Sequence, residues 1–292
     1  MITPHNKSME TLKHSPSPIC LGDTILVADV GNSRIKLGLV ADYGNGTRLP
    51  VISKRQDLVS RSFHPDSLEQ WLQSVAPGPA VILVASVHDG AAARLEAAIA
   101  SVSATQYRPL RQRRVNHVDI PVSISVPEPH RVGIDRLAGA SASKFIKSQQ
   151  RPAIIVDCGT AATVDIVSEE GVFLGGAILP GPKLMTRALA EGTNRLPEVS
   201  ALEQGIVAKM PGKTTQEGIA AGIGWGMRGA IARLVEEAKK CLPVKPAPDI
   251  ILTGGWRAAV RDAVPGAIEV PDLVLCGIAL AASRACARKS TL

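Results

Sequence analysis

Two segments of this 292-residue chain repeat one order of features, and this repeat constrains the fold more than any other part of the sequence. Residues 25–40 read ILVADVGNSRIKLGLV, and residues 153–168 read AIIVDCGTAATVDIVS. Each has an apolar run, Asp-x-Gly, small polar residues and a second apolar run, which is typical of a β-hairpin with a tight turn. Because both segments share this order, we interpret them as corresponding parts of a duplicated domain.

The composition predicts a layered α/β fold. Hydrophobic residues make up 45% of the chain and aromatic residues only 3%, so the core must consist of Ala, Val, Ile and Leu, as where helices cover a sheet. At roughly 150 residues per domain, the length suggests two domains. We predict a flexible polar tail over residues 1–22, a first domain over residues 23–130 and a second over residues 131–292.

Several classes of protein are disfavoured. No apolar run approaches the ~20 residues of a membrane span and no signal peptide is evident, so we expect a cytoplasmic protein without a membrane partner. The cysteines are scattered without a C-x-x-C pair, and we expect reduced thiols rather than a disulfide or zinc framework. They are Cys20, Cys158, Cys241, Cys276 and Cys286.

The net charge of +7 raises the question of nucleic-acid binding. The basic cluster RQRR at residues 111–114 has no interleaved aromatic residues and no reading motif, so we interpret it as a solvated face or a loop. Prolines interrupt residues 106–130, where we expect irregular structure. A positive field also suits an enzyme that handles polyanionic nucleotides, so we expect no nucleic-acid partner.

Each repeat ends its first apolar run with an aspartate, Asp29 or Asp157. These aspartates either only shape their turns or face a shared cleft where the following glycines let a phosphate approach the backbone. Because carboxylates repel phosphates, the second interpretation requires a hard cation such as Mg²⁺ between them. Lys36 either binds the same phosphates or faces solvent on an edge strand.

Two shorter motifs extend this chemistry. The TGG sequence at Thr253–Gly255 follows an apolar run, and its glycines would let a ribose or a flat ring lie against the backbone. In GIDR, Asp135 lies in the first turn of a predicted helix, where it either favours the helix dipole or acts as a general base. Arg136 would bind a substrate carboxylate or pair with an acidic residue.

In this order, the segments DVGNSRIK, GIDR, DCGTAATVD, GGAILPG, TTQEGIAAG and TGG resemble type III pantothenate kinase, within the actin, hexokinase and Hsp70 superfamily. The resemblance covers about residues 25–282. It implies an α/β fold of two duplicated ribonuclease H-like (actin-like ATPase) domains with a cleft between them. It also implies ATP-dependent phosphorylation of pantothenate, the first step of coenzyme A biosynthesis. By resemblance, the enzyme is a cytoplasmic homodimer that needs a divalent metal such as Mg²⁺ and a monovalent cation, K⁺ or NH₄⁺.

The resemblance also implies roles for individual residues. Asp135 is the proton acceptor, and Asp157 binds the monovalent cation, where the residues alone suggested Mg²⁺. Asp29 holds Mg²⁺ through a phosphate. The implied substrate contacts are Gly133, Ile134, Asp135, Arg136 and Thr215. The implied ATP and phosphate contacts are Asp29, Val30, Gly31, Asn32, Ser33, Arg34, Ile35, Lys36, Thr160, Gly254 and Gly255.

The sequence departs from this family at two places. Val126 stands where the family commonly has Tyr, and Thr214 precedes Thr215 where an Asn is usual. The change at Val126 motivates one alternative, a kinase of a related small hydroxy acid. Another is a catalytically silent homologue that regulates partners through the RQRR cluster, although such a copy has no chemical reason to retain Asp29, Asp135 and Asp157.

Overall fold

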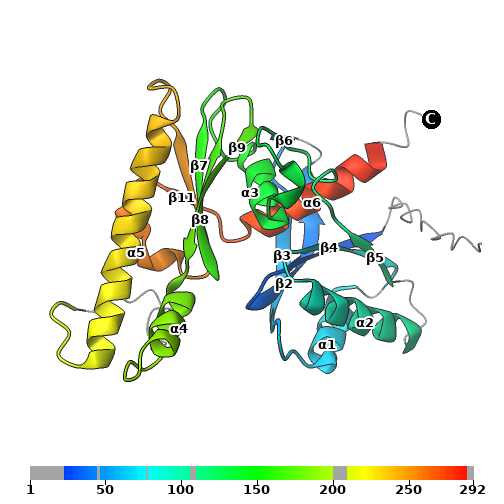
Figure 1. Ribbon diagram of the computed structural model, residues 1–292. Coiled ribbons are helices and arrows are strands. Elements are labelled where there is room, and N and C mark those ends of the chain that lie inside the picture. The colour runs from blue at the N-terminus through cyan, green and yellow to red at the C-terminus, as the bar shows by residue number, and fades with distance from the viewer. Residues whose placement is uncertain (1–22, 45–46, 77, 106–109, 200–208, 288–292) are drawn as a thin grey trace, which may run out of the picture.

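The fold is seen in a computed structural model, which describes residues 23–44, 47–76, 78–105, 110–199 and 209–287 (Figure 1). Two β-sheets alternate with three layers of helices, which confirms the predicted α/β class. The predicted tail over residues 1–22 lies outside the described residues. No helix in the described part of the chain combines the length and hydrophobicity that a membrane span requires.

The first sheet has the strand order β3-β2-β1-β4-β5. Its strands are β1 (Thr24–Val30), β2 (Arg34–Asp42), β3 (Val51–Val59), β4 (Ala80–Ser86) and β5 (Leu110–Arg114). The predicted hairpin is confirmed, because β1 and β2 pair antiparallel with Asp29 opposite Lys36. Strands β1 and β4 pair in parallel at the centre, where helices cover both faces, which fits their nearly continuous apolar sequences.

The second sheet has the order β11-β10-β7-β8-β9-β6. Its strands are β6 (Ser123–Ile124), β7 (Ala153–Cys158), β8 (Ala161–Val167), β9 (Val172–Pro180), β10 (Asp249–Gly254) and β11 (Ile268–Glu269). Apart from the short β6, order and direction match the first sheet: an antiparallel hairpin, a third antiparallel strand, and two parallel strands on the other side. The second predicted hairpin, β7–β8, is therefore also confirmed.

Helices fill the three remaining layers. Helices α1 (Pro65–Val75) and α2 (Asp89–Thr105) cover the outer face of the first sheet. Helices α3 (Ile134–Ser143) and α6 (Leu273–Ala287) lie between the sheets, where the largest apolar cluster joins both (Figure 1). The outer face of the second sheet carries α4 (Pro182–Gly192) and α5 (Thr215–Lys240). Short 3₁₀ turns span Pro129–Arg131, Arg257–Ala259 and Arg261–Ala263.

The RQRR cluster is not the loop or free basic face that the sequence suggested. It lies in β5, the edge strand of the first sheet, so the prediction of wholly irregular structure over residues 106–130 was wrong there. Arg111 pairs with Asp23, Arg113 with Asp119 and Arg114 with Glu96. An edge strand with charged side chains carries no apolar periodicity, which is why the sequence pattern missed it.

Two elements cross the predicted domain boundary after residue 130. Strand β6 precedes this position but pairs with β9 of the second sheet. Helix α6 follows it but packs against β1 and β4 of the first sheet as well as α3. Segments are thus exchanged between the two parts of the chain, and the division into residues 23–130 and 131–292 remains a prediction.

Candidate active site

The first loop, residues 31–33, joins β1 to β2. Asp29 lies near the end of β1, whose central position in the sheet leaves this residue only 7% exposed. Lys36 Nζ lies 3.5 Å from Asp29 Oδ2. The alternative of a solvent-facing lysine on an edge strand was wrong, since β2 lies inside the sheet. Burial by itself lowers the pKa of Lys36, but the carboxylates of Asp29 and Asp157 raise it above its ordinary value. Lys36 is therefore a fixed positive charge among carboxylates.

A serine that the sequence did not single out holds this loop in place. The Ser60 side chain is fully buried, and its hydroxyl donates to the Gly31 carbonyl at 2.8 Å. The Ser60 N–H donates to the Ser33 carbonyl at 3.1 Å. Val30 and Ile35 have fully buried side chains, so these two predicted phosphate contacts have only backbone atoms to offer.

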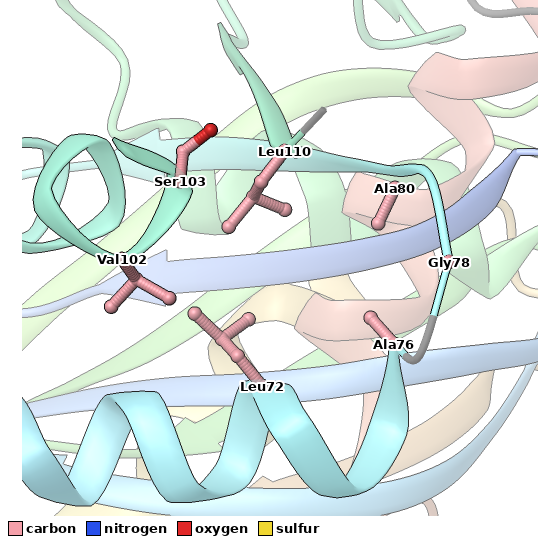
Figure 2. Close-up of a pocket in the computed structure, with 7 residues that line it drawn as sticks. All are labelled: Leu72, Ala76, Gly78, Ala80, Val102, Ser103 and Leu110. Carbon is pink, nitrogen blue, oxygen red and sulfur yellow. The ribbon is translucent and has the colours of Figure 1, made fainter. Parts of the chain in front are cut away.

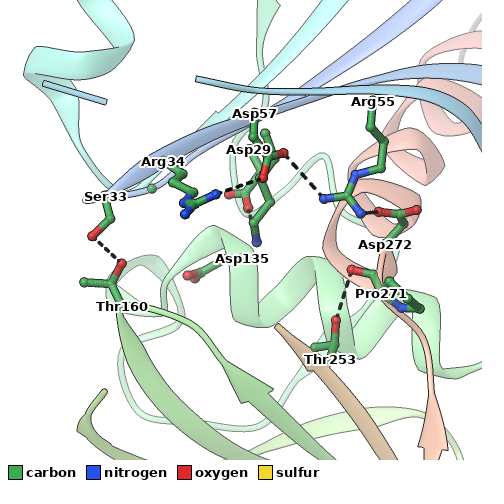
Figure 3. A network of polar contacts seen from close by, with 12 residues as sticks. Asp29, Ser33, Arg34, Arg55, Asp57, Asp135, Thr160, Thr253, Pro271 and Asp272 are labelled. Carbon is green, nitrogen blue, oxygen red and sulfur yellow. Dashed lines mark hydrogen bonds and ion pairs between the residues drawn. The ribbon is translucent and has the colours of Figure 1, made fainter. Parts of the chain in front are cut away.

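The second loop, residues 159–160, joins β7 to β8 and contacts the first loop. Thr160 Oγ1 donates to Ser33 Oγ at 2.9 Å, which joins the turns of the two hairpins (Figure 3). Residues 127 positions apart are thus brought together, as their order in the two repeats predicted. The same view includes the Asp29 and Asp135 side chains, and the charge of Asp135 acts on the pKa of Asp29, so these two carboxylates are close to each other.

Asp157 is the carboxylate best suited to a cation. Its Oδ1 atom is buried, and among the described residues it has no hydrogen-bond partner. Burial raises the pKa of Asp157 to about 6, with further increases from Asp29 and Asp165 and an opposing effect of Lys36. A buried oxygen without a donor destabilises the free protein and suits a hard cation, which prefers oxygen ligands.

The GIDR motif begins α3, as the sequence predicted. Gly133 is the N-cap residue, Ile134 is buried, and Asp135 lies in the first turn. Asp135 Oδ1 accepts a hydrogen bond from the Arg136 N–H at 2.9 Å. Burial raises the pKa of Asp135, and the negative charge of Asp157 raises it further. This carboxylate is thus more basic than a solvated aspartate, which suits a proton acceptor.

Arg136 pairs with an acidic residue that the sequence pattern did not single out. Its Nε donates to Asp165 Oδ1 at 2.9 Å, and its guanidinium carbon lies 5.4 Å from the centre of the Phe173 ring. Asp165 interrupts the apolar alternation of β8, and this interruption was the only signal for it in the sequence.

The carboxylates lie close enough to influence one another. Asp135 and Lys36 both act on the pKa of Asp29, which burial raises, and Asp29 acts on that of Asp157. However, no three His, Cys, Asp or Glu side chains among the described residues converge closely enough to hold a metal ion by themselves. A divalent ion here would need further oxygen ligands, and substrate phosphates supply such oxygens.

The TGG motif packs against the second loop. Gly254 has φ +93°, and a Cβ atom there would lie 2.4 Å from Cys158 backbone atoms, so only glycine fits. Gly255 faces open space. The Trp256 indole N–H, which the sequence did not single out, donates to the Gly159 carbonyl at 2.7 Å. The motif therefore supports the second loop and leaves Gly255 free for a ligand.

Two sequence features lie elsewhere. Thr215 is exposed at the start of α5, and this helix lies on the outer side of the second sheet (Figure 1). In the part of the chain that the structure describes, no hydrogen bond or ion pair joins Thr215 to the carboxylates. Val126 packs on the core between the sheets, with Cγ1 3.7 Å from the place of a Cβ on Gly175.

A small apolar cavity lies between α1, α2 and the first sheet (Figure 2). Its volume is about 20 Å³, whereas small-molecule sites usually measure about 300 Å³ or more. The residues that line it are Leu72, Ala76, Gly78, Ala80, Val102, Ser103 and Leu110. This cavity is a packing defect and offers no site for a substrate.

Comparison with known proteins agrees with this geometry. The type III pantothenate kinase family profile matches residues 25–237. A type III pantothenate kinase of Rhodopirellula baltica is 34% identical over 267 residues, which cover 84% of this chain and 94% of that protein. The corresponding enzyme of Alkalilimnicola ehrlichii is 32% identical over 257 residues, which cover 87% of this chain and 96% of that protein.

Among solved structures, the activator of 2-hydroxyisocaproyl-CoA dehydratase from Clostridium difficile, with bound ADPNP, superimposes with a TM-score of 0.50. The superposition covers 92% of this chain and 98% of that one, at 13% sequence identity. At this identity the likeness concerns the fold alone.

Proposed function

This chain belongs to the type III pantothenate kinase family and phosphorylates pantothenate with ATP in the first step of coenzyme A biosynthesis, and we propose that Asp135 accepts the proton of the substrate hydroxyl. One observation carries this assignment. Asp135 begins a rigid helix beside the two joined loops, where burial and Asp157 raise its pKa. A base with a raised pKa takes the proton more readily as the oxygen attacks the phosphorus atom.

The two loops bind the phosphates of ATP. Backbone N–H groups of the first loop, together with the hydroxyls of Ser33 and Thr160, supply donors at the junction of the hairpins. Lys36 adds a positive charge that Asp29 holds in place. The adenosine lies against Gly255, because Gly254 packs on the Cys158 backbone whereas the space beside Gly255 is open.

Two kinds of cation fit the carboxylates. A divalent metal that enters with ATP would be held by Asp29 together with phosphate oxygens, since no three side chains among the described residues form a cage of their own. The unpartnered Oδ1 of Asp157 suits the monovalent cation, K⁺ or NH₄⁺. When bound, these ions neutralise negative charge on the transferring phosphoryl group.

We also propose that the two sheets are duplicated ribonuclease H-like domains of the actin-like ATPase type, with the substrate cleft between them. The matching strand order and direction support the duplication. The hydrogen bond between Thr160 and Ser33 supports a site at the junction of the sheets, because each hydroxyl comes from a different hairpin. The proposed cleft thus lies at the ends of β1 and β7.

We propose that the active form is a homodimer in the cytoplasm. Helix α5 carries a face of glycines at which an added Cβ atom would meet nothing, and Trp225 beside it is 50% exposed. These glycines are Gly218, Gly222, Gly226 and Gly229. In this proposal a second copy packs on this face and supplies its own Thr215 to the partner, since Thr215 is exposed and makes no contact with the carboxylates in the described part of its own chain.

A direct assay tests the proposed function. Purified protein with ATP, Mg²⁺ and K⁺ should convert pantothenate to phosphopantothenate, followed by ADP release and by mass spectrometry. A panel of small hydroxy acids should show the highest kcat/KM for pantothenate. A preference for another acid would support the alternative that Val126 motivates. A folded protein without kinase activity would support the silent homologue instead.

A further inference from the structure

Asp165 is a buried carboxylate beside the substrate-binding motif, and the roles proposed for phosphates, proton and cations do not use it. Its side chain is 2% exposed. Oδ1 accepts hydrogen bonds from both Nε and Nη2 of Arg136, and Oδ2 accepts one from Thr163 Oγ1 at 3.0 Å. Both oxygens are therefore satisfied, and the carboxylate has a single orientation.

The neighbouring strand is shaped to accept this carboxylate. Gly176 of β9 lies opposite Asp165 in the strand register. A Cβ atom on Gly176 would lie 2.7 Å from Asp165 Oδ1 and 2.1 Å from the Val164 carbonyl oxygen, so any side chain there would displace Asp165. Phe173, also of β9, supports the face of the Arg136 guanidinium. Arg136 is thus fixed by its partner carboxylate and by an aromatic ring.

The contact with Asp165 uses only part of the Arg136 guanidinium. A guanidinium has five N–H groups in one plane, and Asp165 occupies the edge formed by Nε and Nη2. Among the described residues no acceptor binds the edge formed by Nη1 and the second Nη2 hydrogen, so this edge can bind one carboxylate or carbonyl group with two hydrogen bonds. The charges of Arg136 and Asp165 both act on the pKa of Asp135, so the ion pair lies close to the proposed proton acceptor.

We infer that Asp165 is a positioning residue that fixes the free edge of Arg136 toward an oxygen acceptor of the substrate. The inference rests on the proposed function, in which Arg136 contacts pantothenate. Asp165 also balances the charge of Arg136, so the substrate meets an oriented pair of donors rather than a mobile cation. The pair should therefore affect recognition of the acceptor substrate and leave ATP binding unaffected.

The experiment compares Asp165→Asn with a matched control, Asp119→Asn. Asp119 also forms a part-buried ion pair, with Arg113 at 2.8 Å, and accepts a backbone N–H on its other oxygen. It lies at the edge of the first sheet. For Asp165→Asn we expect the KM for pantothenate to rise about tenfold or more, with the KM for ATP changed less than about twofold. Asp119→Asn should leave both values unchanged.

A double-mutant cycle supplies a second measurement. If Asp165 acts through Arg136, then Asp165→Asn should add little to the rise in KM caused by Arg136→Lys. Additive effects of the two substitutions, or an equal rise in both KM values, would overturn the inference. If Asp165→Asn fails to fold, Thr163→Val removes only the hydroxyl that orients Oδ2. A rise of about threefold in the pantothenate KM would then support the inference, and an unchanged value would overturn it.

Different results contradict the proposed function and the positioning role of Asp165. Wild-type protein that is folded but does not phosphorylate pantothenate contradicts the proposed function. Active wild-type protein whose pantothenate KM is insensitive to Asp165→Asn contradicts only the positioning role.

Discussion

At the scale of single residues, the structure concentrates buried charge where the chemistry is proposed. Asp29, Asp135, Asp157 and Asp165 all have raised pKa values, with burial as the main cause in each case. Such groups reduce the stability of the folded chain and are retained when a ligand compensates for them. For Asp157, whose Oδ1 has no partner among the described residues, function and stability should therefore respond to substitution in opposite directions.

The proton acceptor gives the first prediction. Asp135→Asn keeps the shape of the side chain but removes its basicity, so kcat should fall by about a hundredfold or more. ATP binding, measured by calorimetry, should stay within about twofold of wild type. An unchanged kcat would remove Asp135 from the mechanism.

The raised pKa of Asp157 predicts how the stability of the protein depends on pH. Its pKa is 3.8 in the unfolded chain and about 6 in the folded one. Between these values the folded state holds a proton that the unfolded state has released. Stability should therefore be highest at low pH in this window and fall as pH rises, by up to about 1.4 kcal/mol per pH unit from this group.

Urea unfolding at several pH values, in buffer without metal ions, measures this effect. Asp157→Asn should make the pH slope shallower, raise the free energy of unfolding at pH 8 and reduce activity. A pH slope equal to that of wild type would show that Asp157 does not carry the effect.

At the scale of elements, tight turns depend on contacts made by other parts of the chain. The two hairpins and the start of α3 follow from local pattern and could be predicted from the sequence. Ser60, Asp165 and Trp256 could not, because each acts on a loop or side chain distant in sequence. For β5 the reason differs, since its charged side chains pair with acidic residues of other segments.

The Ser60 contact can be tested with a neighbouring serine as control. Ser60→Ala leaves the Gly31 carbonyl without its donor, so the protein should lose about 1–2 kcal/mol and the KM for ATP should rise. Ser62→Ala, at an exposed position, should change neither. Equal effects of both substitutions would contradict a role for Ser60 in holding the loop.

The TGG motif allows a comparison of adjacent glycines. Gly254→Ala forces a Cβ atom against the Cys158 backbone at a positive φ and should cost about 2 kcal/mol or more. Gly255→Ala should change stability little, because its Cβ would meet open space, but it should raise the KM for ATP if the adenosine lies there. Thermal unfolding and steady-state kinetics separate the two outcomes.

At the scale of the whole molecule, the two sheets share the same strand order apart from β6, and they enclose α3 and α6. The turns of their two hairpins contact each other. The repeat in the sequence predicted this symmetry. It did not predict that β6 and α6 would each pack with the other half, since such exchanges depend on tertiary packing that has no local pattern.

The proposed dimer is tested at this scale. Light scattering should give twice the mass of the 292-residue chain. Gly222→Glu on the open face of α5 should produce monomers and raise the KM for pantothenate, because Thr215 of the second copy is then lost. Lys239→Glu, near the other end of the same helix, is the control. A fully active monomer would contradict the role of the partner.

The position of α6 also matters during synthesis of the chain. This helix completes the apolar covering of β1, although it is translated long after that strand. While the ribosome is still making the second sheet, the first sheet has an uncovered hydrophobic face. Such an uncovered apolar face favours aggregation of the nascent chain until α6 emerges.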